Sequence, residues 1–296
     1  MPTSIASAEQ SLESIKDVVA DRKIDIVFPV LHGNYGEDGT VQGLLELMRV
    51  PYVGCGVAAS AVCMDKVLQK NVCSAYQIPV VRYFWLTLGD WRNKRDVVIA
   101  QIFQKFEHQY PLFIKPANQG SSVGITKAHN ELELHQGIAD AFTRDTKVII
   151  EAAVPNAQEI ECAVMGRSDS PVASVLGEII PGNEFYDYAA KYLEDNSQSK
   201  IPAALPAELT SKIRATAQLA FQVLDCWGLA RVDFLVNQKT GEYYLNELNT
   251  MPGFTPISMY PKLWQASGVS YSSLLDKLVG LALERFAEKQ SLNLSR

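Results

Sequence analysis

The 296-residue sequence lacks several features that would place it in particular classes of protein. It has no apolar run of about 18 residues, which argues against a membrane-spanning helix. Its first residues lack the basic region and apolar core of a secretion signal. Lysine and arginine (27) are fewer than aspartate and glutamate (33), so the net charge is −6 and no basic surplus is available for nucleic acid. We therefore expect a cytoplasmic protein without nucleic-acid or membrane partners.

The sequence also lacks the cysteine and histidine spacings of disulfide-rich and zinc-binding proteins. The five cysteines are odd in number and form no Cys-x-x-Cys pair, which argues against a disulfide framework and favours a reducing compartment. The four histidines show no zinc-ligand spacing. There is no G-x-x-x-x-G-K-[ST], and Gly33, Gly36 and Gly39 do not form G-x-G-x-x-G. Two common glycine-rich nucleotide motifs are thereby excluded.

The N-terminal part has the pattern of a parallel β-loop-α-β unit. Residues 24–31 are predicted to form a buried strand that leads into the glycine-rich segment 32–39. A helix with Val41 and Leu45 on one face follows, and residues 51–54 are predicted to form a second short strand.

The rest of the chain predicts an α+β fold. Further helices are expected at about 58–77, 94–108 and 207–226, with two more closing the chain; strands are expected at 111–116, 148–154, 159–166, 172–180, 229–236 and 242–249.

The last two strands form a predicted hairpin that carries four functional side chains. Pairing Val236 with Glu242 places Arg231 opposite Glu247, and the two-residue alternation of a strand puts Asp233 and Asn249 on the same face; slipping the register by two keeps that parity. Two carboxylates and an amide oxygen suit Mg²⁺, and the arginine could bind an oxyanion. The alternative is a solvated sheet face with surface ion pairs.

Two lysines and a small-residue loop are candidate phosphate ligands. Lys115 follows an apolar strand, Lys66 lies near a helix start, and the loop Gly120–Gly124 could wrap a phosphate with backbone N–H groups. Ordinary exposed lysines and a plain β-turn are the alternatives. Ser197 and Lys239 open matches to the S-x-x-K and K-T-G motifs of penicillin-recognising serine enzymes, but no Ser-Asp-Asn lies between them, and we reject that interpretation.

Seven strings, in order along the chain, resemble the ATP-grasp superfamily and, within it, the D-alanine–D-alanine ligase family. The strings lie at 31–43, 64–66, 113–116, 120–124, 185–192, 231–233 and 246–255. The resemblance implies an ATP-grasp architecture: an α/β N-terminal part that is a truncated parallel-sheet substrate domain (1–57), and two α+β subdomains (58–150 and 151–296) that clasp ATP.

The resemblance also implies an activity. ATP would phosphorylate one D-alanine, the amine of a second would attack the acyl phosphate, and the dipeptide would serve peptidoglycan synthesis. A homodimer is implied as well. The residues implied to bind ATP are Lys66, Lys115, Glu151, Ala152, Val154, Glu159, Lys191 and Asn246. Two Mg²⁺ (or Mn²⁺) would be held by Asp233, Glu247 and Asn249.

The implied substrate site is built from separate segments. Arg231 and the Gly253 N–H would stabilise the tetrahedral oxyanion, while Ser121 and Tyr192 would be hydrogen-bonded at the active centre. Tyr192 would lie with Lys191 on a lid and would favour an amine acceptor. The remaining residues implied to bind D-alanine are His32, Ser258 and Met259.

The resemblance has one gap, at the N-terminus. Family members begin with a strand and a Gly-rich Glu-His loop whose glutamate binds the first D-alanine, and only about 23 residues precede Ile24 here. The start could be mis-assigned, or the short form could use another carboxylate. A third possibility is an impaired ATP-binding relative with an interaction role; a ligase with a different acceptor is a further alternative.

Overall fold

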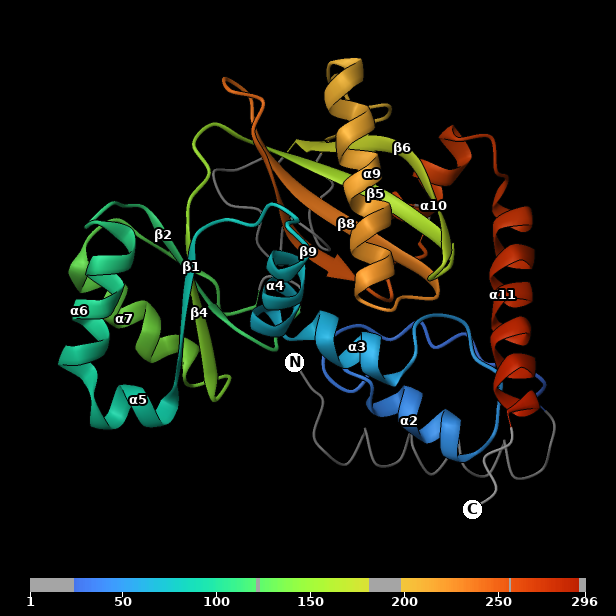
Figure 1. The fold of residues 1–296 in the computed structure, drawn as a ribbon, viewed down its shortest axis with the longest axis horizontal. Coiled ribbons are helices and arrows are strands. Elements are labelled where there is room, and N and C mark those ends of the chain that lie inside the picture. Colours follow the sequence, from blue (N-terminus) through green and yellow to red (C-terminus); the bar gives the residue numbers. More distant parts are fainter. Residues whose placement is uncertain (1–23, 121–122, 181–197, 256, 293–296) are drawn as a thin grey trace.

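A computed structural model of the chain describes residues 24–120, 123–180, 198–255 and 257–292. It is a mixed α/β fold with two antiparallel sheets (Figure 1). The smaller sheet has the order β1-β4-β2-β3 and the larger one β7-β6-β5-β8-β9. The strands are β1 Tyr83–Thr87, β2 Leu112–Pro116, β3 Thr126–Ala128, β4 Lys147–Ala152, β5 Ala157–Arg167, β6 Ser170–Ile180, β7 Gln198–Lys200, β8 Gly228–Asn237 and β9 Tyr243–Asn249. Within the described residues, no helix has the length and apolarity needed to span a membrane.

Three helices cover one face of the smaller sheet. They are α5 Leu88–Asn93, α6 Arg95–Phe106 and α7 Glu131–Ala141, and their apolar side chains share a core with Leu86, Ile114 and Ile150 (Figure 1). Because side chains alternate along a strand, Lys115 and Glu151 lie on the opposite face.

The larger sheet is covered on both faces. One face packs against α9 (Ala207–Val223) and α3 (Val57–Met64), through a core that includes Val232 and Phe234. The other face packs at one end against α10 (Met259–Ala266) and α11 (Tyr271–Ser291), around Leu229. All five cysteines are free and buried, and each belongs to the first of these two cores.

The helix predicted at 58–77 is interrupted. Helix α3 ends at Met64, and α4 (Lys66–Ala75) begins after Asp65, whose backbone is extended. The Asp65 carboxylate accepts hydrogen bonds from the main-chain N–H groups of Val67 and Leu68, at 3.0 and 3.1 Å. This N-cap explains the break, because an aspartate that satisfies free N–H groups starts a new helix.

The prediction of a full strand at 24–31 is wrong. Only Val27 pairs with Tyr52, in a parallel bridge flanked by main-chain hydrogen bonds of 2.9 and 2.8 Å. Pro29 has no N–H to continue such a ladder, and Val30 and Leu31 are exposed. The predicted parallel direction is nevertheless correct, and α2 (Thr40–Leu47) connects the two segments.

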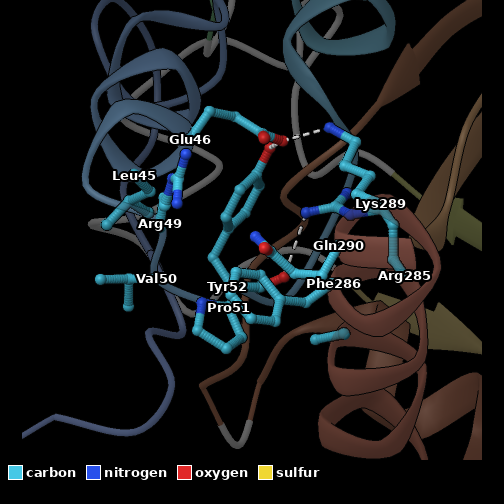
Figure 2. A pocket seen from close by; sticks show the side chains of 11 residues that line it. Leu45, Glu46, Arg49, Val50, Pro51, Tyr52, Arg285, Phe286, Lys289 and Gln290 are labelled. Atoms are coloured by element: carbon cyan, nitrogen blue, oxygen red, sulfur yellow. Dashed lines mark hydrogen bonds and ion pairs between the residues drawn. The ribbon is translucent and has the colours of Figure 1, made fainter. Parts of the chain in front are cut away.

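Hydrogen bonds and an ion pair connect the C-terminal helix α11 to residues 46–54, the N-terminal segment (Figure 2). The Arg285 guanidinium donates to the carbonyls of Gly54 (2.5 Å) and Tyr52 (3.3 Å) and lies 4.2 Å from the centroid of the Tyr52 ring. Glu46 accepts from the Tyr52 hydroxyl at 2.8 Å and from Lys289 Nζ at 2.5 Å.

Candidate functional site

The hairpin β8–β9 carries one wall of the candidate site. Arg231 lies opposite Asn249, and Asp233 opposite Glu247, so the four side chains share one face as the sequence predicts. The predicted pairing of Arg231 with Glu247 is wrong. Val236 pairs with Tyr243 instead of Glu242, which shifts the register by one residue, and an irregularity next to Asp233 shifts it by one more. Because the total shift is two residues, all four side chains stay on the same face.

Arg231 is fixed by acidic neighbours. Its Nε and one terminal nitrogen donate to the two oxygens of Asp233 at 2.7 Å each, and Nε lies 3.2 Å from Glu161 Oε2. Asn249 Nδ2 donates to Asp233 Oδ2 at 2.9 Å. Burial disfavours the guanidinium charge, but Asp233 and Glu161 outweigh it and hold the pKa of Arg231 well above its usual value. The guanidinium is therefore a permanent, oriented cation.

Lys66, the first residue of α4, extends toward the same wall. Its Nζ donates to the main-chain oxygen of Gln119 at 2.7 Å and lies 3.9 Å from Glu247 Oε2. Burial lowers the pKa of Lys66, and Glu247 partly offsets the effect.

Lys115 enters from the smaller sheet. Its Nζ donates to Glu151 Oε2 at 2.6 Å and to Asn246 Oδ1 at 3.4 Å. Burial works against its charge, yet Glu151 raises the pKa of Lys115 above its usual value. The two predicted lysines and the four hairpin residues thus converge from four elements, α4, β2, β8 and β9.

Glu151 is buried between two lysines. Its second oxygen, Oε1, lies 3.1 Å from Nζ of Lys70, a residue that the sequence analysis did not select. Burial alone would raise the pKa of Glu151, but Lys115 and Lys70 lower it to about 2. The available signal was spacing, because Lys70 lies four residues after Lys66 and therefore on the same helix face.

A cavity of about 620 Å³ lies between the two sheets, within the size range of small-molecule pockets. Three predicted ATP-binding residues line it: Ala152, Val154 and Glu159. Phe113 from β2 and Leu235 from β8 add apolar surface from opposite sides. The cavity therefore offers a place for a flat apolar ligand, and the ring centroid of Phe113 in its wall lies 5.9 Å from Lys115 Nζ.

His32 lies at the start of the glycine-rich segment, near the hairpin. Burial lowers the pKa of His32, an interaction with the Met251 main chain opposes this, and the Arg231 cation lowers it further. Burial and the Arg231 cation both favour the neutral imidazole over the charged one.

Glu37 is a further carboxylate near the hairpin, and no sequence motif identified it as a site residue. Its Oε2 accepts from the Gly33 N–H at 2.7 Å. Burial raises the pKa of Glu37 to about 7; the Gly33 hydrogen bond opposes the shift and the charge of Glu247 adds to it. The main chain of Gly120 lies close to the Glu37 carboxylate, because a Cβ built on Gly120 would be 3.7 Å from Glu37 Oε2.

The segment before α10 brings Gly253 and Ser258 together. A Cβ on Gly253 would lie 2.6 Å from Ser258 Oγ, which itself accepts from the Thr255 N–H at 3.0 Å. The side chain of Met259 is buried in the core against Gly177, so only its main chain is available to a ligand. Ser121, Lys191 and Tyr192 lie outside the described residues.

The hairpin has donors that suit a magnesium–phosphate complex. No group of three or more His, Cys, Asp and Glu side chains that could hold a metal occurs in the described part of the chain. Mg²⁺ is usually held by one or two carboxylates together with substrate phosphates and water, so Asp233, Glu247 and the Asn249 amide oxygen fit this role.

The two antiparallel sheets, with a cavity between them and lysines facing carboxylates, define an ATP-grasp enzyme. The family described as "D-ala D-ala ligase C-terminus" matches residues 72–280, and "D-ala D-ala ligase N-terminus" matches residues 3–55. The chain belongs to the D-alanine–D-alanine ligase family.

Individual relatives support this assignment. D-alanine–D-alanine ligase from Acetivibrio thermocellus is 54% identical over 275 residues, which cover 93% of this chain and 72% of the relative. The Clostridium novyi ligase is 50% identical over 91% of this chain and 78% of its own. The solved ligase from Coxiella burnetii aligns with a TM-score of 0.78 at 40% identity, over 90% of this chain and 70% of that one. VanG D-Ala:D-Ser ligase from Enterococcus faecalis aligns equally well, with a TM-score of 0.78 at 40% identity over 88% and 73%.

Proposed function

We propose that the site between the two sheets performs the reaction for which the family is named, the ATP-dependent joining of two D-alanines. The carboxylate of the first D-alanine takes the γ-phosphoryl group of ATP, giving an acyl phosphate and ADP. The amine of the second attacks the acyl carbon, and phosphate leaves from the tetrahedral intermediate. The observation that carries the proposal is the convergence of Lys66 and Lys115 with the Arg231 face of β8–β9 beside the cavity.

The ATP site is proposed to run from the cavity to the lysines. The adenine would lie in the cavity, against the main chain of Ala152 and Val154, with Glu159 near the ribose. Glu151 and Asn246 would orient Lys115, which would bind a phosphate together with Lys66. Catalysis of phosphoryl transfer depends chiefly on such positioned charges.

Asp233, Glu247 and Asn249 are proposed to hold two Mg²⁺ (or Mn²⁺). When bound, these ions would supply charge neutralisation on the phosphoryl oxygens. The protein contributes the orientation of the ligands, since Arg231 and Asn249 both hold the carboxylate of Asp233.

The substrate site is proposed at the other end of the same face. Arg231 would stabilise the oxyanion, with the N–H of Gly253 as the second donor. Ser258 and the main chain of Met259 would bind the carboxylate of the second D-alanine, and His32 would lie beside the first. Ser121, Tyr192 and Lys191, outside the described residues, are proposed to complete the centre and its lid.

At larger scale we propose three structural units, an N-terminal substrate domain (1–57) and two ATP-grasp subdomains (58–150 and 151–296). A homodimer in the cytoplasm is proposed as the working form. Five free thiols are consistent with a reducing compartment. The product would be a precursor of peptidoglycan.

The test is an ADP-release assay with D-alanine, combined with mass spectrometry of the dipeptide. D-Alanine-dependent ADP release and D-alanyl-D-alanine are the expected results. Binding of ATP without such release would overturn the proposal in favour of a nucleotide-binding relative. Because a D-Ala:D-Ser ligase aligns equally well, D-serine is tried as the second substrate; exclusive formation of the mixed dipeptide would reassign the acceptor.

A further inference from the structure

Lys70 is a charged residue in the interior that no step of the proposed reaction uses. It is completely buried, one helical turn after Lys66 on α4. A buried ammonium group needs polar partners to offset the loss of water. Lys70 Nζ has two: Glu151 Oε1 at 3.1 Å and the main-chain oxygen of Asn246 at 3.1 Å.

The two partners belong to different sheets. Glu151 is on β4 of the smaller sheet, and Asn246 is on β9 of the larger one, next to Glu247. Figure 1 shows α4 between the two sheets. The neighbouring Gln69 strengthens this attachment, because its Nε2 donates to the main-chain oxygen of Leu248 at 3.3 Å. Helix α4 is thus attached to β9, which carries Glu247, and to β4, which carries Glu151.

The charges in this group do not cancel. Glu151 pairs through Oε2 with Lys115 at 2.6 Å and through Oε1 with Lys70 at 3.1 Å, so one carboxylate is shared by two ammonium groups. A Lys115–Glu151 pair alone would be neutral. With Lys70 present, the three groups carry a net charge of +1 on the side where Lys115 reaches Asn246.

We propose that Lys70 is a positioning residue for ATP: it shares Glu151 with Lys115, which leaves the three groups with a net positive charge toward phosphate, and it fixes β9 through the Asn246 carbonyl. The inference rests on the proposed function of the site. Lys70 touches neither ATP nor D-alanine in this role and acts only through Glu151, Lys115 and the β9 main chain.

The proposal is tested by calorimetric titration of Mg²⁺-ATP into the full chain, without D-alanine. Lys70→Met removes the charge, and we expect the Kd for ATP to rise about tenfold or more, because the remaining Lys115–Glu151 pair then has no net charge. Lys70→Gln, whose amide can still donate a hydrogen bond, is expected to lose affinity similarly. Lys105→Met, at an exposed position on α6, is the matched control and should bind like the wild type. Thermal unfolding identifies the folded variants.

The decisive variant is Lys70→Met combined with Glu151→Gln. With both charges removed, the net charge of the group is again +1, now carried by Lys115 alone, so ATP should bind more tightly than to Lys70→Met alone. In steady state, the KM for ATP should rise in Lys70→Met while the KM for D-alanine stays unchanged. A folded Lys70→Met or Lys70→Gln chain with wild-type ATP affinity overturns the inference, as does a double variant that binds no better than Lys70→Met. Failure of the proposed function is distinct, since there the wild type itself would release no ADP with D-alanine.

Discussion

Arg231 shows how one side chain acquires a fixed direction in this protein. Two nitrogens bind the two oxygens of Asp233, and Nε also lies within 3.2 Å of Glu161. A guanidinium held in this way loses little freedom when a substrate oxygen binds to it. Lysine could supply the charge but could not bind Asp233 through two parallel hydrogen bonds.

Replacing Arg231 by methionine should therefore act on turnover. We expect the rate of D-alanine-dependent ADP release to fall by about 10²–10³, the usual effect of losing one oxyanion donor. The measurement is kcat for the fraction of the chain that is folded. Arg92→Met, at an exposed position of α5, serves as the control. A wild-type kcat in Arg231→Met would remove Arg231 from the mechanism.

Glu37 makes a prediction about pH. Burial raises the pKa of Glu37 from 4.5 to about 7, so the folded chain binds this proton more tightly than the unfolded chain does. The associated stability is complete below pH 4.5 and is lost as the pH rises through 7. Glu37→Gln mimics the protonated acid, so the nucleotide-free variant should gain stability relative to the wild type between pH 5 and about 8. Urea unfolding at several pH values measures this, and parallel curves for the two proteins would contradict it.

At the level of elements, the contact between β6 and α10 determines where the second-substrate segment lies. Gly177 on β6 leaves just enough room for Met259 and Leu263, since a Cβ there would be 2.4 and 2.8 Å from the ends of these side chains. Ser258 immediately precedes α10. The position of the helix and that of the proposed substrate ligand are therefore coupled.

Gly177→Ala should push α10 away from the sheet. Overpacking of this kind costs about 1–3 kcal/mol of unfolding free energy, and we expect the KM for the second D-alanine to rise as Ser258 moves. Gly280→Ala on α11 is the matched control, because no atom lies within 4 Å of its new Cβ. Denaturant unfolding and D-alanine titration test the two effects; an unchanged stability of Gly177→Ala would show that the core repacks freely.

Helices and strands are predictable from the sequence where a local pattern specifies them, and not where pairing with a distant segment does. The hairpin β8–β9 is predicted by alternation and a turn, but its register depends on an irregularity beside Asp233 that no local pattern reveals. The break between α3 and α4 has a local signal, the capping residue Asp65, although the apolar pattern on either side of it favours one continuous helix. Strand β1 was not predicted, because its stability comes from pairing with β4, about 60 residues later in the chain.

On the scale of the whole molecule, the C-terminal helix α11 contacts the segment around Tyr52 and Gly54 near the N-terminal end of the described chain. Arg285 is buried and supplies donors to the carbonyls of Gly54 and Tyr52. Gly54 packs in turn against Gly228 at the start of β8, since a Cβ at Gly228 would lie 3.3 Å from the Gly54 nitrogen. The N-terminal segment is thereby held beside the strand that carries Arg231.

Arg285→Met should loosen this junction. Losing hydrogen bonds from a charged group to two buried carbonyls is expected to cost about 2–3 kcal/mol of unfolding free energy. Lys289→Met removes only the exposed ion pair with Glu46 and should cost less than about 1 kcal/mol. Chemical denaturation compares the two variants, and equal losses would contradict the central role of Arg285.

Site residues are predictable from the sequence where a short stretch of the chain combines a charged residue with a recognisable strand, turn or helix start. Lys66, Lys115 and the hairpin carboxylates stand out as charged residues on rigid elements, and the structure brings them together. The spacing of Lys70 from Lys66 marks a shared helix face, but neither Lys70 nor Glu161 is identifiable as a buried charge from sequence, because the partners lie far away along the chain. Lys70 contacts residues 81 and 176 positions away, separations that a sequence pattern does not encode.

The burial of all five cysteines has a practical consequence for experiments on this protein. Folded chains should resist maleimide reagents, so a dye can be attached at one introduced surface cysteine without replacing the native ones. A pair of such labels, at exposed Trp85 on β1 and exposed Leu283 on α11, would convert the separation of the two sheets into an optical signal during ATP binding.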